Sequence, residues 1–276
     1  MSDYQDILYA VENHIATITM HRPDRMNAMT NRMNGEIRQA VMTASDDSDV
    51  RAIIITGAGR GFCAGADVAR LSATASGAEG EGVDLPVHGA IPGGLDLPDG
   101  FDAKYAYLAT CPKPLIAAIN GPAIGVGLVI AIYCDIRFAS DTVKFSTAFA
   151  KRGLVPEYGM AWLLPKIIGP SKTMDLIYTS RMLLAAEAKD IGLVDYLAPS
   201  QDLMNKVYDF ARTIVTDVSP RSTRVAKQLV YRGLSQEIDS AVGEAIAATE
   251  AALKSDDFKE GIAAWQEKRP PAFTGK

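Results

Sequence analysis

Two glycine-rich segments hold the backbone groups that are best placed to do chemistry in this chain. GAGRGFCAGADV, residues 57–68, follows the apolar run VRAIIIT, and NGPAIGVGLV, residues 120–129, follows PLIAAIN. Glycine lets a backbone approach a ligand closely, and a helix that begins in such a turn leaves its first N–H groups unpaired. Together the turns could direct two N–H donors at one oxygen atom, as an oxyanion hole requires, whereas either turn alone could be a plain connection.

A single carboxylate follows in a stretch that is otherwise uncharged. In GLVPEYGMAWLLP, residues 153–165, Glu157 is the only charged residue, and Arg152 and Lys166 flank the stretch. A carboxylate among apolar side chains is a candidate general acid or base. The alternative is a structural role, in which Glu157 lies at the start of a helix and interacts with the helix dipole.

The elements that would position these residues alternate between strands and helices. Thr30 is a predicted N-cap for a helix whose apolar residues Met33, Ile37 and Val41 share one face. Six segments have the composition of β-strands, and they are residues 7–11, 15–20, 50–56, 114–120, 135–140 and 143–147. The first two predict a hairpin, and the later recurrence of strand, glycine-rich turn and helix predicts parallel strands with crossover helices.

The pattern changes near residue 200 of the 276 residues. We expect an α/β core over 1–200 and a helical C-terminal region over 201–276. Within the core, residues 72–100 are rich in Gly, Pro, Ala and Asp and are expected to form a mobile loop. The C-terminal helices are amphipathic, and such helices often bury their apolar faces on another subunit, so the chain is expected to form an oligomer.

Charge and composition argue against several classes of function. The net charge of −5 gives no electrostatic reason to expect nucleic acid or an anionic membrane as the main partner. The longest apolar stretch, IGVGLVIAIYC, is too short to span a bilayer. The three histidines and three cysteines form no cluster with metal-ligand spacing, so no metal site is expected. The sparse cysteines indicate reduced thiols and a cytoplasmic location.

Six segments in order resemble the crotonase (enoyl-CoA hydratase/isomerase) superfamily. They are HRPDRMNAMT (21–30), GFCAGADV (61–68), AAINGPAIGVGLVIAIYCDIRFAS (117–140), GLVPEYGMAWLLPKIIG (153–169), AKDIGLVDYL (188–197) and DDFKEGIAAWQEKRPPAF (256–273). The resemblance implies a crotonase-like α/β spiral of ββα units with a helical trimerisation region, assembled as a homotrimer or a dimer of trimers. It also implies an enzyme that acts on acyl-CoA, with coenzyme A present as part of the substrate thioester and no permanently bound cofactor.

The resemblance also assigns roles to individual residues. The backbone N–H groups of Ala66 and Val126 would stabilise the oxygen of a thioester enolate, although hydratases usually have glycine at the second position. The path for coenzyme A would be lined by Arg25, Met26, Ala28, Ala64, Gly65 and Asp67. Arg25 could contact a phosphate or remain a solvated surface side chain. Phe273 and Lys276 of a neighbouring subunit could complete the adenosine pocket.

The reaction type depends on which carboxylates are present. By resemblance, Val129 and Phe149 stand where hydratases carry their two catalytic glutamates, and neither side chain can transfer a proton. Glu157 stands where several enoyl-CoA isomerases carry one acidic residue, which moves a proton from C2 to C4 of the acyl group. Val129, Phe149 and Trp162 would form dry apolar walls. The alternatives are a hydratase with non-standard acid and base groups and a non-catalytic acyl-CoA-binding homologue.

Overall fold

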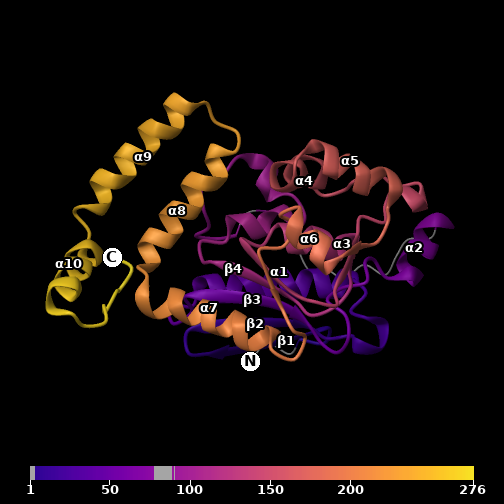
Figure 1. The fold of residues 1–276 in the computed structure, drawn as a ribbon, viewed down its shortest axis with the longest axis horizontal. Helices are drawn as coiled ribbons and strands as arrows, with labels where there is room; N and C mark the ends of the chain where they lie inside the picture. The colour runs from indigo at the N-terminus through magenta and orange to yellow at the C-terminus, as the bar shows by residue number, and fades with distance from the viewer. Residues whose placement is uncertain (1–3, 78–88, 90) are drawn as a thin grey trace.

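A six-stranded sheet lies at the centre of the computed structural model, which describes residues 4–77, 89 and 91–276 (Figure 1). In spatial order its strands are β1 (Ile7–Glu12), β2 (Ile15–Met20), β3 (Ala52–Gly57), β4 (Leu115–Ile119), β6 (Ile136–Ser140) and β9 (Tyr196–Ala198). The β1–β2 pair is antiparallel, and the other neighbouring pairs in this sheet are parallel. The predicted hairpin and the predicted parallel strands are therefore both confirmed.

A second sheet of three short strands carries the second glycine-rich turn. Its order is β5 (Ala123–Ile124), β7 (Lys144–Ser146) and β8 (Leu183–Leu184), with β5 and β7 parallel and β7 and β8 antiparallel. The amide of Gly125 donates to the carbonyl oxygen of Ser146 at 2.9 Å. This bond fixes the backbone at the start of α3 (Val126–Ile132), the helix that follows the turn.

Helices connect the strands of the core. They are α1 (Asn31–Asp46), α2 (Val68–Ala75), α3, α4 (Met160–Ile168), α5 (Pro170–Thr179) and α6 (Ala185–Asp190), with short 3₁₀ helices at Pro23–Arg25, Asp99–Asp102, Ala106–Thr110 and Ala150–Arg152. Helix α1 begins as predicted, because the Thr30 hydroxyl oxygen accepts a hydrogen bond from the Met33 amide at 2.9 Å. Its predicted apolar face, which includes Ile37 and Val41, is buried.

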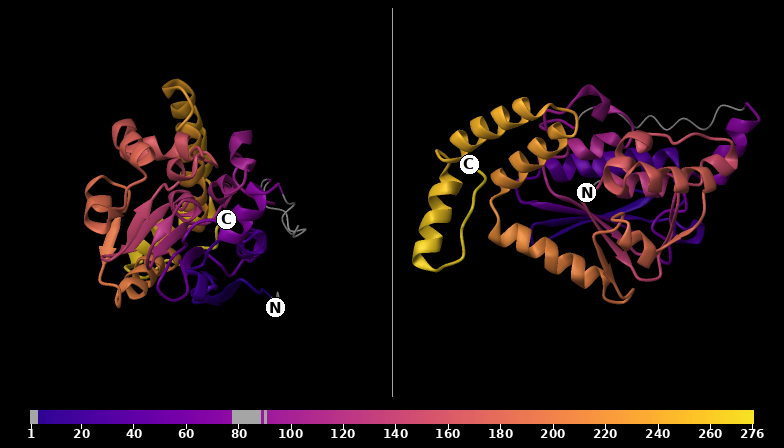
Figure 2. Two further views of the ribbon diagram at one scale, coloured as in Figure 1. Left: turned by 90° about the vertical axis from the view of Figure 1, so that its right-hand side faces the viewer. Right: turned by 45° about the horizontal axis from the view of Figure 1, so that its top comes forward.

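The C-terminal region is helical, as expected. It consists of α7 (Leu203–Asp217), α8 (Pro220–Gly233), α9 (Ile238–Ala252) and α10 (Asp256–Glu267). Helix α7 runs along the central sheet, whereas α8, α9 and α10 extend from one end of the core (Figures 1 and 2). Helix α9 buries none of its residues, and the side chains of Ile238 and Trp265 are 72% and 78% exposed. A single chain therefore leaves apolar side chains of this region uncovered.

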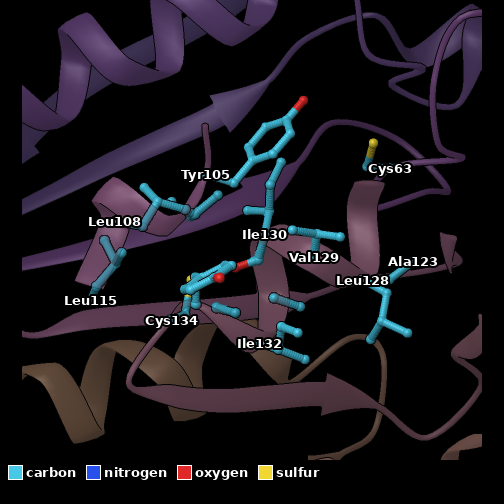
Figure 3. Packing of buried hydrophobic residues seen from close by; sticks show 14 of the residues in the cluster. Cys63, Tyr105, Leu108, Leu115, Ala123, Leu128, Val129, Ile130, Ile132 and Cys134 are labelled. Atoms are coloured by element: carbon cyan, nitrogen blue, oxygen red, sulfur yellow. The ribbon is translucent and has the colours of Figure 1, made fainter. Parts of the chain in front are cut away.

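Strand β3 shows how the sheet is packed on both faces. Ile53 and Ile55 belong to a core cluster that includes side chains of α1 and α3, part of which is seen in Figure 3. Ala52 and Ile54 belong to a second cluster that includes side chains of α7. Successive strand residues point to opposite faces, and all four side chains are fully buried. The prediction that this strand is buried on both faces is confirmed.

The expected mobile loop at residues 72–100 contains regular structure at both ends. Its segment 78–88 and residue 90 lie outside the described residues. Before them, α2 continues to Ala75, because the chain is rich in alanine and has no glycine until Gly77. After them, the 3₁₀ helix Asp99–Asp102 begins inside the expected loop. Residues 72–75 and 99–100 of the expected loop therefore lie in helices.

Over residues 4–77, 89 and 91–276, no helix is both long and apolar enough to cross a membrane. The same residues contain no group of three or more His, Cys, Asp or Glu side chains that could hold a metal ion.

Candidate active site

The two glycine-rich turns lie side by side, joined by their backbones. The amide of Cys63 donates to the Pro122 carbonyl oxygen at 3.0 Å, and the Ile124 amide donates to the Cys63 carbonyl oxygen at 2.9 Å. These bonds make a parallel bridge between Cys63 and Ala123. Ala66 lies three residues after Cys63, and Val126 lies three residues after Ala123. The two residues therefore occupy equivalent positions in the two turns.

Close packing of the turns requires glycine at two positions. A Cβ atom on Gly127 would lie 2.4 Å from the Cys63 carbonyl oxygen, which is a severe clash. Gly65 has a φ of +101°, and a Cβ atom there would lie 3.2 Å from the Ile124 carbonyl oxygen. Without side chains at these two positions, the start of α3 can press directly against the first turn.

The Ala66 and Val126 amides are both available to a ligand. Met29 forms hydrogen bonds with the residues on either side of Ala66. Its amide donates to the Gly65 carbonyl oxygen at 2.8 Å, and its carbonyl oxygen accepts from the Asp67 amide at 3.1 Å. In such a parallel bridge the N–H of Ala66 itself points away from Met29. Val126 is the first residue of α3, where an N–H has no partner within the helix. Among the described residues, neither N–H donates to a protein acceptor.

One cavity contains both amides and the candidate acid. It has a volume of about 280 Å³, and Ala66, Val126 and Glu157 all line it. Ala64, Gly65 and Phe149, three more of the predicted site residues, line it as well, together with Ile124, Tyr158 and others. The structure therefore brings the two glycine-rich turns and the lone carboxylate together around one space.

The Glu157 carboxylate is not used for holding the fold. Glu157 is half-buried, and its carbonyl oxygen accepts from the Met160 amide at 3.1 Å, in the turn that leads into α4. No side-chain hydrogen bond caps α4, and Glu157 lies two residues before its N-cap, Gly159. The alternative of an interaction with the helix dipole therefore stays open beside the chemical role. Within the described part of the chain, its carboxylate makes no hydrogen bond or ion pair. It is therefore available to contact a ligand in the cavity.

A hydrogen bond from the buried side chain of Tyr133 holds the turn that carries Glu157. The Tyr133 hydroxyl donates to the Tyr158 carbonyl oxygen at 2.8 Å. Burial raises the pKa of Tyr133 to about 12, so its hydroxyl stays protonated and remains a donor at neutral pH. Tyr158 and Ala148, which both line the cavity, have positive φ angles of 56° and 60°. Such strained backbone is found at functional sites more than elsewhere.

The segments expected to line the path of coenzyme A lie beside each other. The Ala64 amide donates to the Met26 carbonyl oxygen at 3.0 Å, which joins residues 25–28 to residues 64–67. Arg25 is exposed at the end of its 3₁₀ helix. Ala28 accepts a hydrogen bond from the Arg22 side chain at 2.6 Å. Contacts of these residues with coenzyme A remain a prediction.

Two of the predicted apolar walls lie elsewhere. Val129 is fully buried within α3 and packs in the core, so it does not line the described wall of the cavity (Figure 3). Trp162 lines a separate cavity of about 330 Å³, where its ring packs edge-on against Phe101 at 5.7 Å. Of the three predicted walls, only Phe149 lines the cavity of Glu157.

The predicted adenosine-pocket residues lie far from the cavity of their own chain. The Phe273 carbonyl oxygen accepts from Arg51 at 2.8 Å, and the Lys276 carbonyl oxygen accepts from the Asp257 amide at 3.0 Å. These bonds hold the C-terminus at the opposite end of the molecule from α2 (Figure 1). A contribution of Phe273 and Lys276 from a neighbouring subunit to an adenosine pocket stays a prediction.

Sequence reasoning missed three features of the site. Arg152 lines the cavity, although the sequence suggested only that it flanks the Glu157 stretch. Tyr158 lines it too, and its position next to Glu157 was the only available signal. Arg22 forms an ion pair with Asp67, with 2.8 Å between Nη1 and Oδ2. The Arg22 guanidinium lowers the pKa of the Asp67 carboxyl, chiefly through this hydrogen bond.

Cys63 lies at the bridge between the turns, but its thiol is unsuited to nucleophilic chemistry. The side chain is completely buried. Burial raises the pKa of the Cys63 thiol to about 12. The reactive thiolate is therefore disfavoured at neutral pH.

Comparisons with known proteins agree with the geometry. A sequence profile of the family described as "Enoyl-CoA hydratase/isomerase" matches residues 10–89 and 93–276. The chain is 34% identical over 271 residues to the protein named "Probable enoyl-CoA hydratase echA8" of Mycobacterium bovis, and the match covers 98% of each. It is 32% identical over 270 residues to the "1,2-epoxyphenylacetyl-CoA isomerase" of Escherichia coli, again with 98% of each covered.

A solved structure gives the same result for the fold. The crystal structure of an enoyl-CoA hydratase from Mycobacterium tuberculosis matches this chain with a TM-score of 0.84 at 28% identity. The match covers 98% of this chain and 99% of the other. It therefore includes the central sheet, both glycine-rich turns and the C-terminal helices.

Proposed function

The chain belongs to the enoyl-CoA hydratase/isomerase family and has the crotonase fold, and we propose that it is an enoyl-CoA isomerase with Glu157 as its acid and base. One observation carries the proposal. Glu157 is the only carboxylate among the described residues that line the cavity containing the Ala66 and Val126 amides. A double-bond shift requires one group that can accept and return a proton, and Glu157 has the chemistry for both steps.

The reaction would proceed through a thioester enolate. Glu157 takes the proton from C2, and the electrons of the broken C2–H bond become the π bond between C2 and C3 in the product. The electrons of the former C3=C4 π bond then take the proton back from Glu157 at C4. In the intermediate, negative charge accumulates on the thioester oxygen. The N–H groups of Ala66 and Val126 would donate to this oxygen, and each such donor typically contributes about 3 kcal/mol to the stabilisation of the transition state.

The apolar side chains in the cavity wall favour isomerisation over addition of water. Hydration requires a bound water that carboxylates hold and activate, and by resemblance Phe149 occupies the position of one of the two hydratase glutamates. The Phe149 side chain is 5% exposed and lines the cavity. Leu71 and Leu154 also line it. These three side chains offer water no hydrogen-bond partner, which disfavours competing reactions of an enolate formed beside them.

A hydratase is the second candidate, and the names of related proteins favour it. The Mycobacterium relatives are named as enoyl-CoA hydratases, whereas the Escherichia coli relative is named as an isomerase. In a hydratase, Glu157 would activate water together with a group from outside the described lining. A protein that binds acyl-CoA without catalysis is the third possibility, and it assigns Glu157 no chemical role.

Separate assays with a 3-enoyl-CoA and a 2-enoyl-CoA distinguish these candidates. The isomerase proposal predicts formation of the conjugated 2-enoyl thioester from the first substrate and little hydration of the second. Glu157→Gln should reduce turnover by roughly 10²–10⁴-fold while retaining acyl-CoA binding, because the amide has similar size but cannot accept the proton. Rapid hydration of 2-enoyl-CoA without isomerisation of 3-enoyl-CoA would refute the proposal. Unchanged turnover in Glu157→Gln would also refute it.

We also propose that the chain assembles as a homotrimer or a dimer of trimers. Apolar side chains of α9 and α10 support this proposal, because Ile238, Val242, Ile246 and Trp265 are exposed in the single chain. An exposed apolar face of this kind marks a surface that another protein covers. By resemblance to the family, the partner that covers this surface is a second copy of the chain.

A further inference from the structure

We propose that Arg152 selects acyl groups that carry a carboxylate at the end remote from the thioester. The inference rests on the proposed function, since it assigns a substrate class to the cavity that contains Glu157. Membership of the family indicates a CoA thioester but leaves the acyl group open. Arg152 is the residue of the cavity wall whose chemistry bears on that choice.

Arg152 and Glu157 are the charged residues among those described on the cavity wall. The remaining lining is apolar or uncharged, and its larger side chains include Leu71, Phe149, Leu154 and Tyr158. No ion pair forms between Arg152 and Glu157 within the described structure. A ligand in the cavity therefore meets one carboxylate and one guanidinium at separate places.

The charge of Arg152 is not neutralised by the protein. Its Nη1 donates to the Ala148 carbonyl oxygen at 3.0 Å, which ties the side chain to the cavity wall. Among the residues that the structure describes, no carboxylate lies within ion-pair distance of the guanidinium. A guanidinium has five N–H donors, so most of them remain available to a ligand.

The backbone around Arg152 is shaped to present this side chain. Arg152 ends the 3₁₀ helix Ala150–Arg152, and its amide donates to the Phe149 carbonyl oxygen at 2.9 Å. The acceptor of its guanidinium, Ala148, is 8% exposed and has a φ of 60°, which is unfavourable for a residue other than glycine. Strain of this kind persists where the surrounding structure enforces it, as at ligand sites.

A carboxylate is the group that best matches Arg152. The planar guanidinium can bind the two oxygens of a carboxylate at once, which adds directional specificity to the charge attraction. The phosphates of coenzyme A could offer similar oxygens, but the whole pantetheine arm separates them from the thioester. The thioester oxygen must meet Ala66 and Val126 in the same cavity of about 280 Å³. The group that reaches Arg152 therefore belongs to the acyl side.

The test compares two thioesters that differ in one group. (E)-3-hexenoyl-CoA and the mono-CoA thioester of (E)-3-hexenedioic acid share a chain length and a double bond, and only the second has a terminal carboxylate. Ultraviolet absorbance reports the conjugated product. We expect wild-type kcat/KM to be higher for the diacid thioester. Arg152→Gln should lower the ratio of the two kcat/KM values, diacid thioester over hexenoyl-CoA, roughly tenfold, mainly through KM for the diacid thioester.

Two further variants serve as controls for Arg152→Gln. Arg152→Lys keeps the positive charge without the planar fork and should restore part of the preference. Lys151→Gln removes a neighbouring exposed cation that is not among the described lining residues, and it should leave both substrates unaffected. Equal losses for both substrates in Arg152→Gln would overturn the proposal, because they would assign Arg152 to coenzyme A or to the shared chemistry.

Binding of a saturated pair separates this proposal from the isomerase proposal. Hexanoyl-CoA and the mono-CoA thioester of hexanedioic acid cannot isomerise, so calorimetry measures their Kd values without turnover. We expect the wild type to prefer the diacid thioester and Arg152→Gln to lose that preference. Equal wild-type affinities, or a preference that survives in Arg152→Gln, would overturn the role of Arg152 even in an active isomerase. A preference lost in Arg152→Gln would support it even if neither 3-enoyl thioester were isomerised.

Discussion

The Arg22 guanidinium donates to the Asp67 carboxylate at 2.8 Å and, through the same nitrogen, to the Ala28 carbonyl oxygen at 2.6 Å. Asp67 directly follows Ala66, whose amide is one of the two proposed donors to the thioester oxygen. The Asp67 amide is itself bound to the Met29 carbonyl oxygen at 3.1 Å. Side chain and backbone of Asp67 therefore both fix the peptide next to that amide, and Arg22 acts as a positioning residue.

The Arg22–Asp67 pair should make stability depend on pH. Because Arg22 lowers the pKa of folded Asp67, the pair's contribution is fully present above the unfolded pKa, about 3.9, and is lost as pH falls through the lower folded pKa. Asp67→Asn should cost about 1 kcal/mol at neutral pH, and its difference from wild type should shrink in acid. Thermal unfolding over this pH range measures the effect.

A matched control for Asp67→Asn is Asp256→Asn. Asp256 pairs with Lys259 on the surface of α10, where both side chains are more than two-thirds exposed. Such pairs contribute little, so this variant should hardly change the unfolding temperature. Asp67→Asn should also lower kcat, whereas Asp256→Asn should not. A kcat unchanged in Asp67→Asn would contradict the positioning role of Arg22.

Gly127→Ala should damage both stability and turnover. The new Cβ atom would meet the carbonyl oxygen of Cys63 at 2.4 Å and its Cβ atom at 2.8 Å, so α3 must shift away from the first turn. We expect a loss of about 1–3 kcal/mol in the free energy of unfolding and a fall in kcat, because the Val126 amide moves with α3. Denaturant unfolding and steady-state kinetics measure the two effects.

Gly243→Ala is the control for that substitution. Gly243 lies within α9, and a Cβ atom there would meet nothing within 4 Å. Alanine should therefore be neutral or stabilise the helix by up to about 1 kcal/mol, with activity unchanged. If Gly127→Ala behaved like Gly243→Ala, the tight packing of the two turns would not be needed for catalysis.

Local patterns in the sequence predicted much of the fold. The hairpin, the Thr30 cap of α1 and the two glycine-rich turns each depend on short segments whose residue types constrain the backbone. Resemblance to the family then identified Ala66, Val126 and Glu157, which the structure places around one cavity.

Side-chain directions and long-range pairs could not be predicted in the same way. Val129 and Trp162 lie on helices close to the site, and the rotation of each helix in the packed structure turns them away from the cavity. Arg22 and Asp67 are 45 residues apart, so only tertiary packing brings them together. Arg152 lines the cavity because its turn closes on Phe149, which a charge pattern does not reveal.

Tyr133→Phe should loosen the turn that carries Glu157. The variant removes the hydroxyl that donates to the Tyr158 carbonyl oxygen at 2.8 Å, at a cost of about 1 kcal/mol or more in stability. Turnover should fall because Glu157 directly precedes Tyr158. Unfolding and kcat are measured together, since a loss of stability with unchanged kcat would contradict the role of Tyr133 in positioning Glu157.

A double-mutant cycle isolates the contact of the same hydroxyl with Gly159. A Cβ atom on Gly159 would lie 2.3 Å from the Tyr133 hydroxyl oxygen but 3.7 Å from the ring carbon that carries it. Gly159→Ala should therefore cost less stability in Tyr133→Phe than in the wild type. The remaining cost reflects the φ of +74° at Gly159, which disfavours alanine in either background. Equal costs in the two backgrounds would show that the hydroxyl does not restrict this turn.

The apolar face of α9 should hold the oligomer together. Val242 and Ile246 lie one helical turn apart and are 48% and 56% exposed in the single chain. Ile246→Asp would place a charge in the buried interface, so light scattering should show a smaller species than the wild-type oligomer. Ser240→Asp, on the opposite face of α9, should leave the mass unchanged. A wild type that is monomeric at micromolar concentration would contradict the proposed assembly.

If Phe273 and Lys276 of a neighbouring subunit complete the adenosine pocket, Ile246→Asp should also raise KM for acyl-CoA while kcat changes little, because the Glu157 cavity lies within one chain.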